Sequence, residues 1–310
     1  MKGVILADKL YKRLIESENP PEDIQLALNL INSLDLDLDI LDYEKITVTL
    51  DNEEEGKFYY DGELRDLPDF AISIALSHRD DYNLQAAKRM FETKGCKYIN
   101  SVQTTQIAKD KLYSLQLIKE AIPEIKIPKT MLINQFTTPE MIMDYIGLPC
   151  VVKIMDGLQG KGVTLAKDKK ELETILTMLF AAENNNQYIA QEAIMTSKGR
   201  DLRIAIANNE LIYSFVRSSG GDDFRSNTHV NGRIEDYEPS EELLDLSFRV
   251  AEAINLPYGS IDYLFGENDE EFYLCEVNTF PGFSKLLKAI AENDEETIRI
   301  FKELPQKLLK

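Results

Sequence analysis

The chain has 310 residues, which predicts two or three domains and a core large enough to fold without disulfide or metal staples. Its net charge is −19, from 54 acidic residues against 35 Lys and Arg. This balance argues against nucleic acid or an anionic membrane as a general partner, because both are bound by clustered basic side chains. The apolar fraction of 44% is typical of a globular protein and not of a disordered one.

The three cysteines are odd in number and widely spaced, at Cys96, Cys150 and Cys275. With two histidines and no CxxC motif, they predict reduced thiols and disfavour a zinc site. The opening segment turns charged too soon for a signal peptide, and no stretch approaches the roughly 20 apolar residues of a membrane span. We therefore expect a cytoplasmic protein, with a homo-oligomer as an open expectation.

The first hundred residues alternate buried strands with helices. The expected elements are a strand at 3–7, a helix at 24–34, strands at 36–41 and 70–76, and a helix at 82–95. Gly95 stands where the last of these helices needs a C-terminal cap. Alternation of strand and helix predicts a small parallel α/β domain over residues 1–100.

Beyond residue 100 the pattern changes to hairpins separated by helices. The expected elements are a helix at 104–121, strands within 125–133 and 187–194, hairpins over 150–166, 202–216 and 261–277, and a helix at 169–180. Antiparallel hairpins with helices on one side predict an α+β body. We place its internal boundary near 190, which gives a central lobe over 101–190 and a C-terminal lobe over 191–310.

A glycine-rich turn at 156–162 joins the strands of the first hairpin. It does not fit the Walker pattern, which requires four residues between the first Gly and the Gly-Lys pair and a helix afterwards. Such a turn can still fold over a polyphosphate through its backbone N–H groups, although an ordinary hairpin turn is the simpler explanation. Lys153 precedes it among Val and Ile, which favours an anionic partner unless the lysine lies on a solvated face.

The last hairpin brings two carboxylates together. We expect its turn to close with Gly266 opposite Phe272. Asp262 then lies opposite Glu276, and Asn278 shares their face because side chains alternate along a strand. A divalent cation removes the repulsion between the carboxylates, and two carboxylates with an amide oxygen suit Mg²⁺ or Mn²⁺. The alternative, two solvated acidic residues, is disfavoured by their apolar neighbours.

Three arginines are expected near this hairpin: Arg203, Arg217 and Arg225, the last within the run 221–229. In so acidic a chain, these arginines are expected to bind phosphate and carboxylate groups. The alternative is that they form ordinary surface ion pairs. His229 has no carboxylate and nucleophile arranged around it in the sequence, so we predict no hydrolytic triad and leave its role open.

Taken in order, these motifs resemble the ATP-grasp superfamily, and within it the RimK-type amino-acid (alpha-L-glutamate) ligases, over about residues 109–283. The matching pieces are Asp110-Lys111, Lys153, Gln191-Glu192, 199–203, 221–229, Asp262, 276–278 and Pro281-Gly282. The resemblance implies an ATP-grasp fold of two α+β lobes behind an N-terminal parallel α/β (pre-ATP-grasp) domain. Two features depart from it. The family's His-x-Gly-Gly is His-Val-Asn-Gly at 229–232, and the run 278–283 also resembles D-alanine–D-alanine ligases.

The resemblance also implies roles for individual residues. The ATP-binding residues it implies are Lys111, Lys153, Gln159, Gly160, Lys161, Gly162, Gln191, Glu192, Ala193, Asp201, Arg225, Ser226 and Asn227. Two Mg²⁺ or Mn²⁺ ions would be held by Asp262, Glu276 and Asn278. Arg225 would stabilise a tetrahedral oxyanion, with Arg203 and Arg217 as catalytic carboxylate clamps.

The implied activity is an ATP-dependent carboxylate–amine ligase that works through an acyl phosphate. Its expected substrates are glutamate or a similar amino acid and an amine or peptide terminus. One alternative is a small-molecule kinase, which would make ADP without an amide. The other enzyme alternative is a D-alanine–D-alanine-like dipeptide ligase. A non-catalytic nucleotide-binding module typically lacks a metal ligand or a phosphate-contacting lysine, and all of these are present here.

Overall fold

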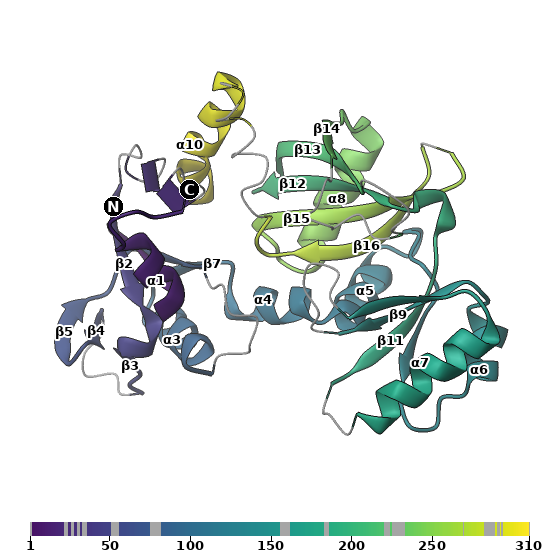
Figure 1. The fold of residues 1–310 in the computed structure, drawn as a ribbon. Coiled ribbons are helices and arrows are strands. Elements are labelled where there is room, and N and C mark those ends of the chain that lie inside the picture. The colour runs from purple at the N-terminus through teal and green to yellow at the C-terminus, as the bar shows by residue number, and fades with distance from the viewer. Residues whose placement is uncertain are drawn as a thin grey trace. The chain divides into compact units, whose positions relative to one another are not determined.

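The structure is a computed structural model, and its chain forms two compact units (Figure 1). The described residues are 2–21, 24–25, 28–29, 32, 36–50, 56–74, 82–155, 162–182, 186–219, 224, 233–268, 270–281, 289, 292 and 294–309. The first unit comprises Met1–Thr105 with Gly282–Lys310, and the second comprises Gln106–Pro281. The boundary predicted near 190 lies inside the second unit and stays a prediction. Residues 282–310, which we placed in the C-terminal lobe, group with the first unit.

A four-stranded parallel sheet forms the core of the first unit, as the strand–helix alternation predicts. Its order is β2-β1-β6-β7, with β1 at Lys2–Ala7, β2 at Asp37–Asp42, β6 at Phe70–Ile74 and β7 at Lys97–Ile99. On one face, Leu6 packs with Phe91 of α3 (Tyr82–Thr93). On the other, Ile5 packs with Ile24 and with Ile15 of α1 (Lys9–Ile15). Burial on both faces explains why β1 and β6 are almost continuously apolar.

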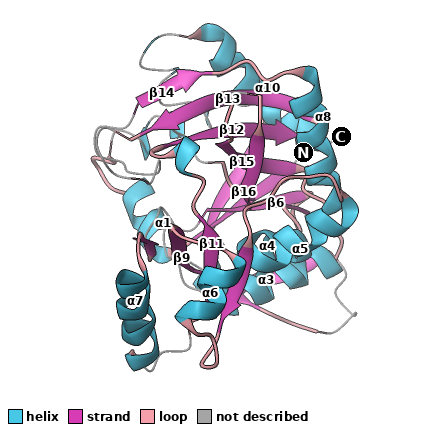
Figure 2. Ribbon diagram, turned by 90° about the vertical axis from the view of Figure 1, so that its right-hand side faces the viewer, coloured by secondary structure: helices cyan, strands magenta, loops and turns pink. Residues whose placement is uncertain are grey.

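A second, antiparallel sheet in this unit was not predicted. Its strands β3 (Ile46–Thr47), β4 (Lys57–Tyr60) and β5 (Glu63–Asp66) follow the short 3-10 helix η1 (Tyr43–Lys45). They are too short for a period of two to stand out in the sequence. Asp61 and Gly62 both have positive φ (53° and 82°) and close the turn between β4 and β5. The unit also contains α10 (Glu295–Leu309), and Figures 1 and 2 draw its two chain ends near one another.

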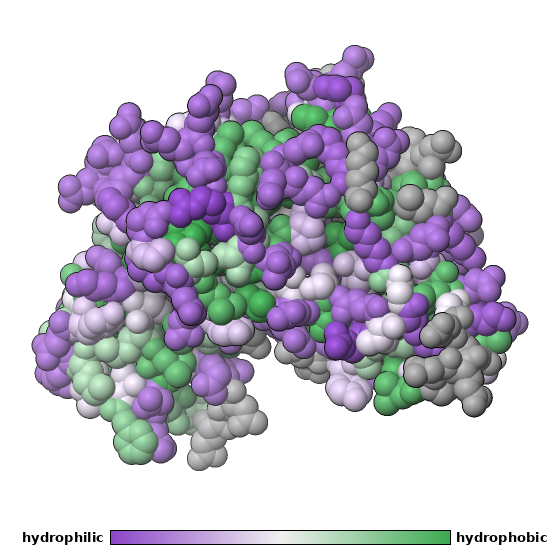
Figure 3. Space-filling model, turned by 180° about the vertical axis from the view of Figure 1, so that it is seen from behind, coloured by the Kyte–Doolittle hydropathy of each residue, from purple (hydrophilic) through white to green (hydrophobic). Residues whose placement is uncertain are grey.

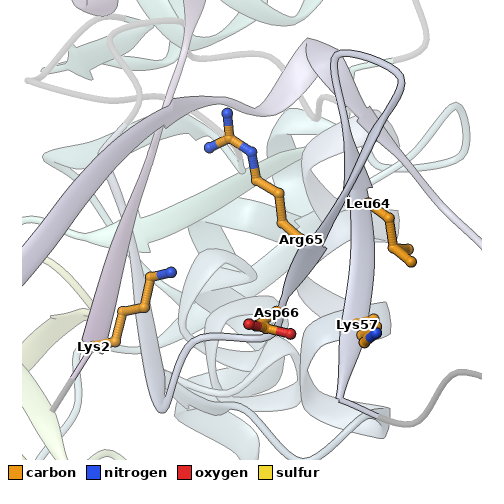
Figure 4. Close-up of a pocket in the computed structure, with 5 residues that line it drawn as sticks. All are labelled: Lys2, Lys57, Leu64, Arg65 and Asp66. Carbon is orange, nitrogen blue, oxygen red and sulfur yellow. The ribbon is translucent and has the colours of Figure 1, made fainter.

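A hollow of about 370 Å³ in the first unit is lined by Lys2, Lys57, Leu64, Arg65 and Asp66 (Figure 4). Arg65 is already engaged, because its guanidinium lies 3.3 Å from an Asp39 carboxylate oxygen and over the Tyr60 ring. The lining carries charges of both signs and no residue of the predicted site. We assign it no function.

The smaller sheet of the second unit has the order β10-β9-β11-β8 and is antiparallel. Its strands are β8 (Thr130–Ile133), β9 (Cys150–Ile154), β10 (Val163–Ala166) and β11 (Tyr188–Glu192). Two helices, α6 (Pro139–Tyr145) and α7 (Lys169–Ala181), pack on one face through Ile142 and Leu172 against Val152 (Figure 2). Lys153 therefore belongs to the opposite face.

The larger sheet has the order β14-β13-β12-β15-β16 and holds the predicted metal ligands together with Asp201, Arg203 and Arg217. Its strands are β12 (Arg200–Ala207), β13 (Glu210–Ser218), β14 (Arg233–Asp236), β15 (Tyr258–Phe265) and β16 (Phe272–Asn278), and the 3-10 helix η2 (Met195–Ser197) precedes them. One face packs Ile204 and Ile261 against α5 (Lys111–Ala121) and α8 (Glu241–Ala253) through Ile118 and Val250. The polar side chains occupy the other face.

Several local predictions can be compared with these elements. The hairpin about Asn208 and Asn209 is confirmed, with φ of 46° and 61°, and so is the cap at Gly95, with φ of 97°. The single helix predicted over 104–121 is wrong. Asp110 ends α4 (Val102–Lys109) and begins α5, because its side chain caps a new helix. Helices α1, α6, α8 and α10 were not predicted, and the helix at 24–34 falls partly outside the described residues.

Hydrophilic side chains cover much of the face drawn in Figure 3, with apolar patches between them. In the part of the chain that the structure describes, no helix is long and apolar enough to cross a membrane.

Asp110→Ala is expected to lower the free energy of unfolding by about 1 kcal/mol, as loss of an N-cap usually does. The Asp110 carboxylate accepts hydrogen bonds from the Leu112 and Tyr113 backbone N–H groups at 3.1 and 2.9 Å. Urea unfolding followed by circular dichroism measures the change. Asp110→Asn is the matched control, since its amide oxygen also caps a helix. An equal loss in both variants would contradict the capping role.

Candidate active site

Charged side chains meet on the face of the larger sheet that points away from α5 and α8. The strand register places Asp262 of β15 opposite Arg203 of β12 and opposite Glu276 of β16. The same register places Arg217 of β13 opposite Asp201 of β12. Four strands therefore contribute charges to one patch.

Asp262 lies at the centre of this patch and is only 1% exposed. Arg203 binds it with two hydrogen bonds, from Nε to Oδ1 at 2.8 Å and from Nη2 to Oδ2 at 2.6 Å. Arg217 donates to Asp262 Oδ2 at 2.9 Å and also binds both carboxylate oxygens of Asp201, at 2.7 and 2.5 Å. Two buried carboxylates are thus held by two guanidinium groups, which is the geometry that a buried charge requires.

The ion pairs of Asp262 with Arg203 and Arg217 shift the pKa values of the paired groups. Burial acts to raise the pKa of Asp262, but the Arg203 and Arg217 guanidinium groups outweigh it and hold the pKa below its usual range. Burial acts to lower the pKa of Arg217, but the Asp262 and Asp201 carboxylates outweigh burial and raise the pKa of Arg217. Asp262, Arg203 and Arg217 therefore stay ionised at neutral pH.

The predicted register of the last hairpin is right at Asp262 and wrong at the turn. The turn closes with Phe265, not Gly266, opposite Phe272. One extra residue on β16, Cys275, forms a bulge and restores the predicted pair of carboxylates. The prediction reached the right pair through two errors that offset each other.

Glu276 and Asn278 complete the predicted metal-binding set. Asn278 Nδ2 lies 3.3 Å from Asp262 Oδ2 and 3.4 Å from Glu276 Oε1. Turning this amide by 180° presents its oxygen in place of its nitrogen. Among the described residues no three His, Cys, Asp or Glu side chains gather at metal-binding spacing, so the predicted set depends on Asn278 for its third oxygen. Two carboxylates and an amide oxygen fit a hard divalent cation such as Mg²⁺ or Mn²⁺.

The smaller sheet contributes Lys153 and Gln191, which the resemblance assigns to ATP. Lys153 Nζ donates to Gln191 Oε1 at 2.5 Å, and Gln191 Nε2 donates to Thr130 Oγ1 at 2.9 Å. Burial raises the pKa of Cys275 to about 11, and the Lys153 ammonium opposes this shift. The Leu274 backbone N–H of β16 donates to the Lys126 carbonyl at 2.9 Å, shortly before β8, so the smaller sheet is joined to the larger one beside this strand.

Other residues implied to bind ATP are held by backbone contacts. Lys111 Nζ donates to the Met155 carbonyl oxygen at 3.0 Å, at the start of the glycine-rich turn. Glu192 accepts a hydrogen bond from the Lys129 backbone N–H at 3.2 Å, and Ala193 N–H donates to the Pro149 carbonyl at 3.4 Å. Gly162 has φ of 72°, and a Cβ there would meet Ile154 Cγ2 at 2.6 Å, so the turn requires glycine at its end.

Several predicted site residues lie outside the described residues: Gln159, Gly160, Lys161, Arg225, Ser226, Asn227 and His229. Their roles stay predictions. The carboxylates that Arg203 and Arg217 bind in this structure belong to the protein itself.

The sequence analysis missed four residues next to this patch. Tyr213 and Phe215 stack with ring centroids 5.6 Å apart on the face that carries Arg217, while Thr130 binds Gln191 and Ser260 lies opposite Asn278. Positions 213, 215 and 217 alternate along one strand, as do 260 and 262. That alternation was the available signal.

Residues 108–300 match the RimK-like ATP-grasp domain. The chain belongs to this family. A probable alpha-L-glutamate ligase from Enterobacter sp. (strain 638) is 31% identical over 75% of this chain and 76% of that protein. A ribosomal protein bS6–L-glutamate ligase from Salmonella paratyphi B is 31% identical over 76% of this chain and 77% of that protein. A probable alpha-L-glutamate ligase from Rhodopirellula baltica is 28% identical, and the match spans 81% of this chain but only 60% of that protein.

Solved structures show the same fold at low sequence identity. The ATP-grasp ligase PsnB, complexed with a phosphomimetic variant of its minimal precursor, Mg and ADP, has a TM-score of 0.69 and 18% identity over 96% of this chain and 98% of its own. The D-alanine–D-alanine ligase from Bacillus anthracis complexed with ATP has a TM-score of 0.64 and 18% identity over 99% of this chain and 96% of its own. The predicted ATP-grasp fold and the predicted family are confirmed.

Asp262→Asn is expected to lower the free energy of unfolding near neutral pH by about 3 kcal/mol, because it leaves Arg203 and Arg217 with too little buried counter-charge. The Asp262 pKa is lowered on folding, so its contribution is present above the unfolded pKa of about 3.9 and is lost as pH falls through the folded value. The difference from wild type should therefore shrink in acid.

Urea unfolding near pH 7 and near pH 3 measures this difference. Asp39→Asn is the control, because Asp39 pairs with Arg65 at the surface and an exposed pair contributes less than about 1 kcal/mol. A deficit in Asp262→Asn that is equal at both pH values would contradict the lowered pKa.

Proposed function

We propose that this chain uses ATP to join a carboxyl group to an amine, adding glutamate or a similar amino acid to an amine or a peptide terminus. The observation that carries the proposal is the patch of Asp262, Glu276 and Asn278 in a chain of the RimK-like ATP-grasp family. The choice of glutamate rests on relatives that are named glutamate ligases.

ATP is proposed to bind between the two sheets of the second unit. Lys111 and Lys153 would contact its phosphates, and the turn that ends at Gly162 would close over them. Gln191, Glu192 and Ala193 would border the adenine. The remaining residues proposed for the nucleotide are Gln159, Gly160, Lys161, Asp201, Arg225, Ser226 and Asn227.

The divalent cations are proposed to be held by Asp262, Glu276 and Asn278, two ions by likeness to the family. When bound, such ions neutralise the charge on the phosphates during transfer. The described contacts of Arg203 and Arg217 support a role in holding the Asp262 and Asp201 carboxylates in place. Their action as clamps for a substrate carboxylate stays a prediction.

The proposed reaction has two steps. A substrate carboxylate oxygen attacks the γ-phosphorus of ATP, and the bond between that phosphorus and the ADP oxygen breaks, which yields an acyl phosphate. The amine nitrogen of the second substrate then attacks the carbonyl carbon, phosphate leaves, and the nitrogen loses a proton. Arg225 is proposed to donate hydrogen bonds to the oxyanion between these events.

The experiment described below also distinguishes two alternative activities. A kinase would phosphorylate a hydroxyl group and form no amide. A dipeptide ligase resembling the Bacillus anthracis neighbour in fold would join two small amino acids, and the run 278–283 gave the first indication of that likeness.

With ATP, Mg²⁺ and a panel of amino acids and small amines, the protein is expected to release ADP and phosphate together with an amide product, detected by mass spectrometry. Adding hydroxylamine should trap the acyl phosphate as a hydroxamate. Release of AMP and pyrophosphate would show an adenylating enzyme and contradict the mechanism. ADP release with a phosphorylated hydroxyl product would establish the kinase instead.

Glu276→Gln is expected to lower turnover at least about 100-fold, because removing even an outer-shell partner of a bound metal costs about 10–100-fold. The fold should persist, and the affinity for Mn²⁺ in a direct binding titration should fall with the activity. Glu270→Gln, an exposed change in the turn of the same hairpin, is the control and should leave both unchanged. Unaltered Mn²⁺ affinity in Glu276→Gln would exclude Glu276 as a ligand.

A further inference from the structure

Ser260 on β15 is a fully buried serine on the polar face of the larger sheet, at 0% exposure. Among the residues that the structure describes, its hydroxyl oxygen has no hydrogen-bond partner. The other two buried side-chain atoms of this kind, on Gln85 and Tyr98, belong to the first unit. An orphan hydroxyl is unusual, because buried polar groups in native proteins are almost always hydrogen-bonded.

The other buried serines of the second unit all have partners. These partners are the Lys111 carbonyl for Ser114, the Arg200 carbonyl for Ser197, the Tyr237 carbonyl for Ser214, and the Leu243 carbonyl and Tyr263 hydroxyl for Ser247. A buried serine that serves the fold in this protein is thus bonded within it. Ser260 departs from that rule, so its partner has to come from outside the described protein residues.

The register shows where the Ser260 hydroxyl lies. Ser260 is opposite Asn278 on β16, and the next pair on the same face is Asp262 with Glu276. Two residues along a strand span about 6.6 Å, so the hydroxyl belongs to the immediate surroundings of the proposed cation site. Ala205 lies opposite Ser260 on β12, so the neighbouring strand brings no side-chain donor or acceptor to this position.

Lys153 marks the nucleotide end of the site. The smaller sheet, which holds Lys153, joins the larger one beside Leu274, whose backbone N–H donates to the Lys126 carbonyl at 2.9 Å shortly before β8. From Leu274 the strand β16 runs through Glu276 to Asn278, away from that junction. Ser260, opposite Asn278, therefore lies beyond the carboxylate pair as seen from the junction. In phosphoryl transfer the attacking and leaving oxygens lie roughly in line on opposite sides of the phosphorus. With ADP on the Lys153 side, the attacking carboxylate occupies the Ser260 side.

We propose that the Ser260 hydroxyl donates a hydrogen bond to the substrate carboxylate that the enzyme activates, and so helps to select that substrate. The inference rests on the proposed function, and it adds a contact that the sequence motifs did not indicate. A hydroxyl suits this place because it binds an anion without adding charge beside Arg203 and Asp262.

The test compares Ser260→Ala with Ser247→Ala, a matched pair of fully buried serines that flank the same sheet. Ser260→Ala should lower kcat/KM for the carboxylate substrate about tenfold, leave the KM for ATP unchanged, and leave the thermal midpoint of the ligand-free protein unchanged. Ser247→Ala breaks two internal hydrogen bonds and should lower the midpoint by about 2–4 °C, with kcat/KM unchanged.

Each other result counts against the inference. A thermal midpoint for Ser260→Ala as low as that of Ser247→Ala would show that the Ser260 hydroxyl is hydrogen-bonded within the protein. A raised KM for ATP would show that the hydroxyl contacts the nucleotide. An unchanged kcat/KM would show that it does not contact the carboxylate substrate.

A wild-type protein that forms no amide would instead overturn the proposed function. The inference is then decided by the rise in thermal midpoint that L-glutamate causes in the presence of Mg²⁺ and a non-hydrolysable ATP analogue. A smaller rise in Ser260→Ala than in wild type supports the contact, and an equal rise, or none in either, rejects it.

Discussion

Burying the Asp262 carboxylate at 1% exposure imposes a requirement that organises the larger sheet, because an unpaired charge in that position would be strongly destabilising. Two guanidinium groups meet the requirement, Arg203 from β12 and Arg217 from β13. Arg217 in turn needs Asp201, and Arg203 also donates to the Pro281 carbonyl at 2.9 Å. The network thus connects three strands and the segment that follows β16. It fixes the position of one proposed metal ligand before any ion is bound.

Because side chains alternate along the strands, one face of this sheet forms part of the core and the other face carries the candidate site. Ile204, Ile261 and Tyr263 point into the core formed with α5 and α8, while their neighbours in the sequence point to the site. The core therefore holds the site residues in register through the backbone. A substitution on one face need not disturb the other, so Ser260 on the site face can be compared with Ser247 of α8, which packs against the core face.

Local signals in the sequence were sufficient for much of this arrangement. The alternation of strands and helices predicted the parallel sheet, and the Asn208-Asn209 pair predicted its hairpin, because both signals involve residues close in the chain. The bulge at Cys275 leaves no such signal, since it depends on how β15 and β16 twist against one another. The pairing of Arg203 with Asp262 joins residues 59 positions apart. The sequence could place both near the site, but it could not show that they bind each other.

The same network explains how the site could attract a cation although it already contains two arginines. Arg203 and Arg217 balance the charges of Asp262 and Asp201, with which they form their closest ion pairs. Glu276 accepts a single hydrogen bond among the described residues, from the neutral amide of Asn278 at 3.4 Å, and the ion pairs that both arginines form in this part of the chain are with Asp262 and Asp201. The negative charge that those pairs leave unbalanced in the patch is that of Glu276. In the proposed metal site Asp262 would mainly orient the ligands, whereas Glu276 would supply the charge that draws the ion in, so the two carboxylates of one ladder pair would have different roles.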